Sequence, residues 1–474
     1  MLFNSLEFAL FLPIVFILYW FVLQKKTKNQ NILLVLASYF FYGWWDWRFL
    51  SLILISSFID FYIGKQLNNI IDKSKRKLLL TLSIVINIGF LGFFKYYNFF
   101  TDSFVEAFSF FGTSFSADRL QIILPVGISF YTFQTLSYSI DVYRNKLKPT
   151  NDIVSFLAFV SFFPQLVAGP IERATHLLPQ FYKKREFSYE YAKSGVQLIV
   201  WGLFKKMVIA DNAAIIVDGV FSNYETQSGF SLIFGAFLFA FQIYGDFSGY
   251  SDIAIGTSRL FGFDLMANFK FPYLSKNIGE FWKRWHISLS SWFRDYVYFP
   301  LGGSKKTLVL AIRNVFIVFL ISGFWHGANW TFIFWGLIHA VLYIPLFISN
   351  KTGLKSRLKP NIFVNILKML FTFLIVTFAW VFFRADTITD AFIYLKRIFL
   401  NESGSSFFLS TSKYKVITLF SILSILFLTV VEFQNQNKSK FEVHLNKYKL
   451  VILCLVIAFF GALKNHANFI YFQF

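Results

Sequence analysis

The sequence predicts an all-α protein that crosses a membrane many times. Only 15% of its 474 residues are charged and 56% are hydrophobic, whereas a soluble domain carries about 25% charged residues. The apolar residues also form continuous runs, unlike the alternating pattern of lipid-facing barrel strands. A soluble enzyme and a disordered chain are excluded, because neither would be so apolar. With a single cysteine, Cys454, a disulfide scaffold is excluded as well.

The apolar runs give a map of the membrane segments. A helix that spans a bilayer needs about 20 mostly apolar residues, so we expect about 11–13 membrane helices, with re-entrant or interfacial segments included. The candidate runs cover residues 6–23, 31–44, 49–65, 78–94, 120–142, 152–168, 194–222, 230–246, 308–325, 330–349, 364–383, 414–432 and 450–463. No long hydrophilic stretch separates them, and a single integral membrane domain over residues 1–474 is predicted.

The distribution of basic residues predicts the topology. The net charge of +20 has its simplest explanation in the positive-inside rule, and no nucleic-acid partner is inferred from it. Clusters follow the first, third and fifth apolar runs, which places them in the cytoplasm if the N-terminus lies outside. These clusters lie at residues 25–28, 73–77 and 144–148, and two more lie at residues 351–359 and 438–449.

The alternation of sides breaks between residues 152 and 222. The loop after the run 152–168 should face outward, yet it is basic. Its basic residues are Arg173, Lys183, Lys184 and Arg185. The run 194–222 is interrupted by Lys205, Lys206 and Asp211. Charges at membrane depth need protein or a water-filled cavity around them, so part of 152–222 is predicted to be re-entrant or half-spanning. The alternative is a misplaced helix end.

Polar residues crowd into residues 242–330, where the chemistry is expected. Asp246 and Asp252 lie with three glycines at the end of a predicted membrane helix. Such glycines let helix backbones approach closely, and buried carboxylates need partners. A structural cap explains this pair of aspartates as well as a catalytic site does.

Residues 277–296 predict a helix that lies in the membrane interface. One stripe is apolar, with its tryptophans expected at the lipid boundary, and the opposite face is charged. The stripe consists of Ile278, Phe281, Trp282, Trp285, Leu289, Trp292, Phe293 and Tyr296, and the charged face of Glu280, Lys283, Arg284 and Arg294. His286 lies at the border. An interfacial anchor explains most of this pattern, but not the titratable histidine.

His326 follows an apolar run and lies between Gly323 and Gly327. A histidine beside a membrane span is a functional hypothesis by default, and its neutral imidazole can take up a proton as a general base. The alternative is a hydrogen-bonded packing residue. His339, with apolar neighbours, is predicted to be structural. No role is predicted for His176, His444 or His466.

Other reaction classes have no support in the sequence. It contains no Gly-x-Ser-x-Gly nucleophile elbow, no His-Glu-x-x-His zinc motif and no Walker loop, so hydrolysis by those routes is not expected. No metal and no bound cofactor are required.

Several of these segments together resemble the membrane-bound O-acyltransferase family, in its alginate O-acetyltransferase branch. The teichoic acid D-alanyltransferases are more distant relatives. The segments that carry the resemblance are Met1–Phe8, Gln165–Arg173, Tyr244–Gly256, Asn268–Tyr273, Phe281–Ser290, Tyr298–Gly303 and Gly323–Gly327. The motif core covers residues 125–345, and the helices of 400–474 are the least family-specific part.

The resemblance implies a helical fold around a central tunnel. It also implies that His326 is the family's essential histidine and His286 its second recurrent one. The expected reaction moves an acyl group, expected to be acetyl, from a cytoplasmic thioester such as acetyl-CoA to a polysaccharide outside the cell. A separate periplasmic or extracellular protein is the expected acyl acceptor, and the bacterial cytoplasmic membrane the expected location.

Further residues are candidates for the substrate path. They are Asp246, Trp282, Arg284, Arg294, Trp325 and Asn329. Trp325, Asn329 and Trp330 are close to His326 in sequence and could donate hydrogen bonds to a developing oxyanion. Lys283, Arg284 and Arg294 could hold donor phosphates or anionic lipid.

Two other functions fit part of the sequence. A polysaccharide or small-molecule transporter without covalent chemistry would also have broken helices and intramembrane charges, although no internal repeat is visible. A catalytically silent scaffold is the other alternative, and the intact histidines argue against it.

Overall fold

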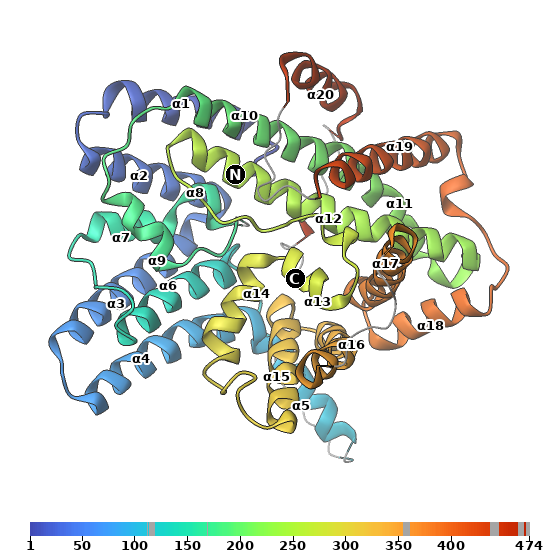
Figure 1. Ribbon diagram of the computed structural model, residues 1–474, viewed down its shortest axis with the longest axis horizontal. Helices are drawn as coiled ribbons and strands as arrows, with labels where there is room; N and C mark the ends of the chain where they lie inside the picture. Colours follow the sequence, from blue (N-terminus) through green and yellow to red (C-terminus); the bar gives the residue numbers. More distant parts are fainter. Residues whose placement is uncertain are drawn as a thin grey trace. The chain divides into compact units, whose positions relative to one another are not determined.

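The computed structural model describes residues 1–110, 112, 119–167, 169–353, 361–436, 445–462 and 469–470 (Figure 1). Within these ranges the regular elements are helices, and the one β-contact is an isolated bridge between Gln227 and Ser405. The predicted all-α class is therefore confirmed. Several predicted features, namely Lys355, Arg357, Lys359, Lys438, Lys440, His444 and His466, lie outside the described residues.

The helices form two compact units. Unit 1 comprises Met1–Val196 and Ala254–Met266, and unit 2 comprises Gln197–Ile253 and Ala267–Phe474. The single domain over 1–474 and its motif core stay predictions. The two predicted histidines, His286 and His326, belong to unit 2.

Seven helical stretches of the described residues are long and apolar enough to cross a membrane. They are 27–69, which contains α2 (Thr27–Asp46) and α3 (Leu50–Asn69); 73–110, which contains α4 (Lys73–Leu91) and α5 (Tyr97–Phe110); α12 (Gly229–Leu260); α15 (Leu308–His326); α16 (Trp330–Thr352); α17 (Ile362–Arg384); and α19 (Ser412–Asn435). Shorter apolar helices include α1 (Leu6–Ile17) and α20 (Lys447–Phe460). The chain is thus a multi-pass membrane protein, while the total of 11–13 stays a prediction.

In unit 1, the side chain of Asn31 joins segments that the sequence placed on opposite sides of the membrane. Asn31 donates hydrogen bonds to Ser155 Oγ (3.1 Å) and to the carbonyl oxygen of Phe181 (2.9 Å). It accepts one from Arg185 (2.7 Å). The basic loop that contains Arg185 therefore lies beside the N-terminus of α2 and the basic cluster at 25–28.

A second contact in unit 1 brings two more basic clusters together. The Arg76 guanidinium donates to the carbonyl oxygen of Tyr143 (2.8 Å) and to Asn145 Oδ1 (3.1 Å). The clusters at 73–77 and 144–148 thus lie together, and the second of them leads directly into α7 (Ile153–Ser161).

The basic loop at residues 169–185 lies beside the basic residues near the start of α2, and the re-entrant course predicted for part of 152–222 stays a prediction. Within the described residues, the run 152–168 does not form one membrane-length helix. It forms α7, with 9 residues, and α8 (Phe163–Leu166), with 4 residues, separated by the non-helical Phe162. At a rise of 1.5 Å per residue, α7 covers about half of the hydrocarbon core. The chain then leads into the basic loop, as the predicted re-entrant course requires.

The predicted continuous interfacial helix over 277–296 is wrong. The segment contains two short helices, α13 (Ile278–Arg284) and α14 (Ile287–Phe293), and the break lies at His286, whose φ of 43° is left-handed. Its tryptophans do not all lie at a lipid boundary, since Trp285 and Trp292 are only 1% and 5% exposed. The apolar stripe packs against other helices of unit 2.

Candidate active site

Close packing of α15 against α16 sets the position of His326 (Figure 1). A Cβ atom at Gly323 would lie 2.3 Å from the carbonyl oxygen of Phe332, and one at Gly336 would lie 2.4 Å from that of Phe319. Only glycine permits this approach at both positions. His326 is the last residue of α15, and its ring lies against that of Trp335 on α16.

The surroundings of His326 are aromatic. Its ring centroid lies 5.1 Å from that of Trp325, 5.2 Å from that of Trp335 and 5.4 Å from that of Phe383. The residue is 2% exposed. Such walls exclude water and strengthen any hydrogen bond that the imidazole makes.

His286 is held by the side chain of Asn268. Its Nδ1 lies 3.0 Å from Asn268 Oδ1, which also accepts from the backbone N–H and the hydroxyl of Ser288 (3.3 and 2.9 Å). Because Oδ1 is an acceptor, Nδ1 carries the proton, and Nε2 has the lone pair. Burial lowers the pKa of His286 to about 3, so this imidazole is neutral at physiological pH.

The structure brings the two predicted histidines together. Their ring centroids are 6.4 Å apart, and Trp325 lies 6.0 Å from His286. On the other side, the ring of Phe247 from α12 packs edge-on against His286 at 4.6 Å. The two imidazoles thus share one aromatic enclosure, although their roles stay predictions.

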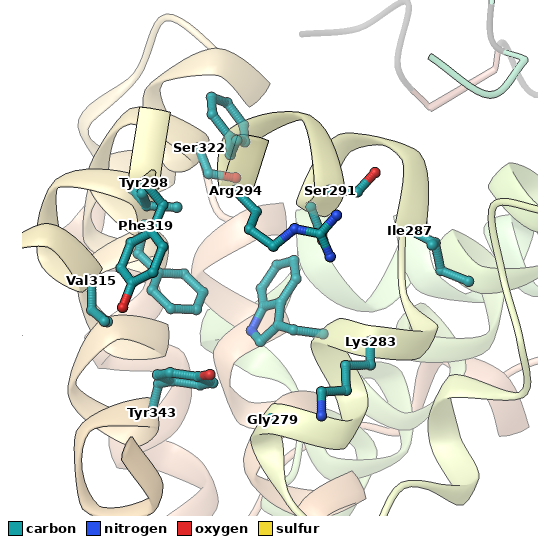
Figure 2. Close-up of a pocket in the computed structure, with 14 residues that line it drawn as sticks. Gly279, Lys283, Ile287, Ser291, Arg294, Tyr298, Val315, Phe319, Ser322 and Tyr343 are labelled. Carbon is teal, nitrogen blue, oxygen red and sulfur yellow. The ribbon is translucent and has the colours of Figure 1, made fainter. Parts of the chain in front are cut away.

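A pocket of about 350 Å³ lies beside α13, α14 and α15 (Figure 2). It is lined by Gly279, Trp282, Lys283, Ile287, Ser290, Ser291, Phe293, Arg294, Tyr298, Val315, Val318, Phe319, Ser322 and Tyr343. Lys283 and Arg294 are exposed, whereas Ser322 is buried and lies one helical turn before His326. The pocket therefore has a charged, exposed part and a buried end near the candidate base.

The comparisons with known proteins agree with this geometry. Residues 149–385 match the family model described as MBOAT, membrane-bound O-acyltransferase family. The chain is 41% identical over 391 residues to "Probable alginate O-acetylase AlgI" of Pseudomonas putida, covering 82% of this chain and 78% of that relative. The chain belongs to the membrane-bound O-acyltransferase family. It is an O-acyltransferase.

Two further relatives of this acyltransferase differ in their named substrates. A "Peptidoglycan O-acetyltransferase" of Helicobacter pylori is 38% identical over 426 residues, covering 84% of this chain and 79% of the relative. A "Teichoic acid D-alanyltransferase" of Bacillus subtilis is 32% identical over 282 residues, covering 55% of this chain and 69% of the relative.

Of the other residues predicted for the substrate path, some lie at the pocket or beside the histidines and others are engaged in contacts elsewhere. Trp282 and Arg294 line the pocket, and Trp325 contacts both histidines. Arg284 instead pairs with Glu280 at 2.5 Å. Asn329 caps α16 by accepting from Thr331 N (3.0 Å), and it donates to the carbonyl oxygen of Asp386 (2.9 Å). The geometry gives Arg284 and Asn329 structural tasks.

Asp246 belongs to a buried network of ion pairs on α12 and the π-helical turn η5 (Phe204–Ala210). The Lys206 ammonium lies 2.7 Å from Asp246 and 2.7 Å from Asp211. Lys205 lies 2.6 Å from Asp252, and Asp246 also accepts from the backbone N–H of Ile470 (2.7 Å). Opposite charges thus stabilise one another, which explains how the run 194–222 contains lysines.

Sequence reasoning did not single out two residues near His286 and His326, namely Asn268 and Ser322. Asn268 lies within a recognised segment, but only the fold shows its bond to His286. Ser322 could have been found from its spacing of one helical turn before His326. His339, predicted to be structural, lies beside Trp282 and Trp335.

Proposed function

We propose that this O-acyltransferase transfers an acetyl group from a cytoplasmic acyl thioester, such as acetyl-CoA, for the O-acylation of an extracellular or cell-wall polysaccharide. The curated relatives named for alginate, peptidoglycan and teichoic acid support a glycopolymer as the final substrate. The observation that carries the proposal is the close approach of the two histidines, His286 and His326, near the pocket lined by Lys283 and Arg294.

The opening of the pocket is assigned to the cytoplasmic side in this proposal. The ammonium group of Lys351, at the end of α16, donates to the carbonyl oxygen of Lys306, just before α15 (2.8 Å). These basic ends of α15 and α16 lie at the cytoplasm under the positive-inside rule. His326, at the other end of α15, is therefore reached from the cytoplasm along the pocket. The membrane is proposed to be the bacterial cytoplasmic membrane.

The donor fits the pocket by its chemistry. The donor phosphates would bind Lys283 and Arg294, both exposed, and the less polar arm would extend along Phe293 and Phe319. This direction places the thioester near Ser322, one turn from His326. An apolar pocket with a few polar groups is the usual form of a small-molecule site.

The histidines would carry out the proton transfers. Nε2 or Nδ1 of His326 removes the proton from the acceptor hydroxyl as that oxygen bonds to the thioester carbonyl carbon. The tetrahedral intermediate collapses, the carbon–sulfur bond breaks, and the thiolate takes the proton back from His326. His286, neutral and fixed by Asn268, would orient the reacting groups beside His326.

A partner protein would complete the transfer. The final polymer lies outside the cell, whereas the described helices belong to the membrane. We therefore propose a separate periplasmic or extracellular protein that receives the acyl group from this enzyme. The bilayer is the enzyme's other partner.

The proposal is tested with three strains that are otherwise identical: the wild type, a deletion, and a strain that carries His326→Ala at matched protein level. Ester-linked acetate on the extracellular and cell-wall polysaccharides is measured by alkaline release. We expect its loss in both mutant strains. Unchanged acetate in the deletion would contradict the proposed reaction, and loss in the deletion alone would remove His326 from the chemistry.

A further inference from the structure

Three aromatic rings lie between the pocket and His326 in unit 2. The ring centroid of His339 lies 4.8 Å from that of Trp335 and 5.1 Å from that of Trp282, and the two indoles are 5.7 Å apart. Trp282 lines the pocket, while Trp335 contacts His326 at 5.2 Å. The triangle of Trp282, Trp335 and His339 thus connects the proposed donor site with the proposed base.

The polar atoms of this triangle have no hydrogen-bond partners among the residues that the structure describes. This holds for the indole Nε1 of Trp282, the indole Nε1 of Trp335, and both ring nitrogens of His339. All four atoms are buried, and His339 and Trp335 are 0% exposed. A buried N–H without a partner carries a free-energy cost, and several within one contact cluster require an explanation.

The orientation of Trp282 relates these atoms to the pocket. Its side chain is half-buried and lines the pocket, yet its Nε1 atom is inaccessible. The N–H therefore lies on the buried side of the ring, toward the protein interior that also holds Trp335 and His339. A donor arm bound in this pocket would lie against the ring of Trp282.

We infer that Trp282 and Trp335, supported by His339, form the hydrogen-bonding site for the carbonyl oxygen of the acyl donor. This inference rests on the proposed acyl transfer. When the acceptor oxygen bonds to the carbonyl carbon, the electron pair of the C=O bond moves onto the oxygen, and it returns when the carbon–sulfur bond breaks. Two indole N–H groups would donate to that oxyanion within a water-excluded enclosure, where such bonds are strongest.

The site replaces two of the three oxyanion donors expected from proximity in sequence, Asn329 and Trp330. Asn329 is committed to the cap of α16 and to Asp386, and Trp330 is 52% exposed. Trp335 lies in direct ring contact with His326, and its indole N–H has no hydrogen-bond partner among the described residues. His339 packs against both indoles and is a positioning residue, because it touches the proposed donors rather than the substrate.

The test removes the N–H groups without changing the shape of the rings. Trp282 and Trp335 are replaced one at a time by benzothienylalanine, in which sulfur stands where indole has N–H. Inverted membrane vesicles receive labelled acetyl-CoA, and acetyl ester formed on the polymer gives kcat and KM. We expect kcat to fall about 10²–10³-fold for each variant, with KM within twofold of wild type and no lower thermal midpoint in detergent.

Trp20 of unit 1 supplies the matched control. Its Nε1 donates to the carbonyl oxygen of Leu260 at 2.8 Å, so the same replacement removes a structural hydrogen bond. We expect a lower thermal midpoint and an unchanged kcat there. His339→Phe, which keeps an aromatic ring, should lower kcat less than either isostere and leave KM unchanged.

Two results would overturn the inference. One is kcat within twofold of wild type in both isostere variants. The other is a loss of kcat accompanied by a drop in thermal midpoint as large as that of the Trp20 variant, as expected if the indoles only hold a structural water. If wild-type transfer still depends on His326, the proposed function survives either result. If wild-type vesicles show no His326-dependent acetyl transfer, both proposals fail.

Discussion

Two histidine environments, one in each unit, differ in almost every respect. His176 of unit 1 is 39% exposed and bonds through Nδ1 to the buried carboxylate of Glu172 at 2.7 Å, with Asp264 at 3.7 Å from Nε2. Those carboxylates, Asp264 first and then Glu172, raise the pKa of His176 to about 10. His286 of unit 2 is fully buried among aromatic rings, and burial lowers its pKa to about 3.

The difference shows what each environment is suited for. Glu172 also accepts from the backbone N–H of Met266, so the charged His176 joins two segments of unit 1. An imidazolium that is permanently charged cannot act as a general base near pH 7. A neutral imidazole in an enclosure that excludes water has a lone pair ready for a proton. Position beside aromatic rings, rather than the number of hydrogen bonds, therefore marks the site for chemistry.

The largest expected effect comes from making the same substitution, histidine to glutamine, in the two environments. The residues changed are His326, which shares the enclosure of His286, and His176 of unit 1. His326→Gln should lower acetyl transfer in membrane vesicles about 10²–10⁴-fold, because a general base contributes that much. His176→Gln should keep the rate within about twofold, because a charged histidine takes no part in proton transfer. Equal losses in the two variants, at matched protein levels, would show that the comparison does not separate chemistry from structure.

Asn268→Ala tests whether the imidazole of His286 must also be held in a fixed orientation. The change leaves Nδ1 of His286 and the backbone N–H of Ser288 without their acceptor. Unfolding free energy should fall by about 1–3 kcal/mol, the cost of a buried unsatisfied donor, and transfer should fall with it. Ser194→Ala, at a hydroxyl of unit 1 that accepts from Arg259 (3.2 Å), is the control. Full activity in Asn268→Ala would contradict an orienting role for His286.

The stability of the protein should depend on pH through the charge of His176, whose pKa differs between the folded and unfolded states. The folded-state pKa of His176, about 10, lies above the unfolded value of about 6.5. Its stabilising contribution is therefore complete below about pH 6.5 and is lost as pH rises toward 10. The thermal midpoint of wild type minus that of His176→Gln should be positive at pH 6 and shrink by pH 10. A difference that grows with pH would refute the charged state.

The smallest expected effect is on stability, and it distinguishes Asn329 as the N-cap of α16 from Asn329 as a hydrogen-bond donor to the oxyanion. Asn329→Ala removes the acceptor for Thr331 N at the start of α16. Loss of an N-cap costs about 1 kcal/mol, visible as a small drop in thermal midpoint, and kcat should not change. Asn329→Ser, which can still cap, should restore the midpoint. A fall in kcat of tenfold or more in Asn329→Ala would return Asn329 to the oxyanion site.

The sequence by itself determined the membrane class, most of the long apolar helices and the family, while the roles of His286 and His326 stay predictions. It could do so because hydropathy is a local property that the bilayer imposes on each segment. The motifs around His286 and His326 are likewise continuous stretches of chain, and they identified the family before any contact was known.

Only the tertiary structure decided how distant segments meet. Asn268 bonds to His286 at the break between α13 and α14, which the helical periodicity of the sequence does not reveal. Asn31 bonds to segments that hydropathy had assigned to opposite sides of the membrane. The sequence also did not show which side chains are already paired. Arg284 forms an ion pair with Glu280, whereas the indole N–H groups of Trp282 and Trp335 have no hydrogen-bond partner among the described residues. Such outcomes depend on packing between segments far apart in the chain, because a hydrogen bond needs its partner within about 3 Å.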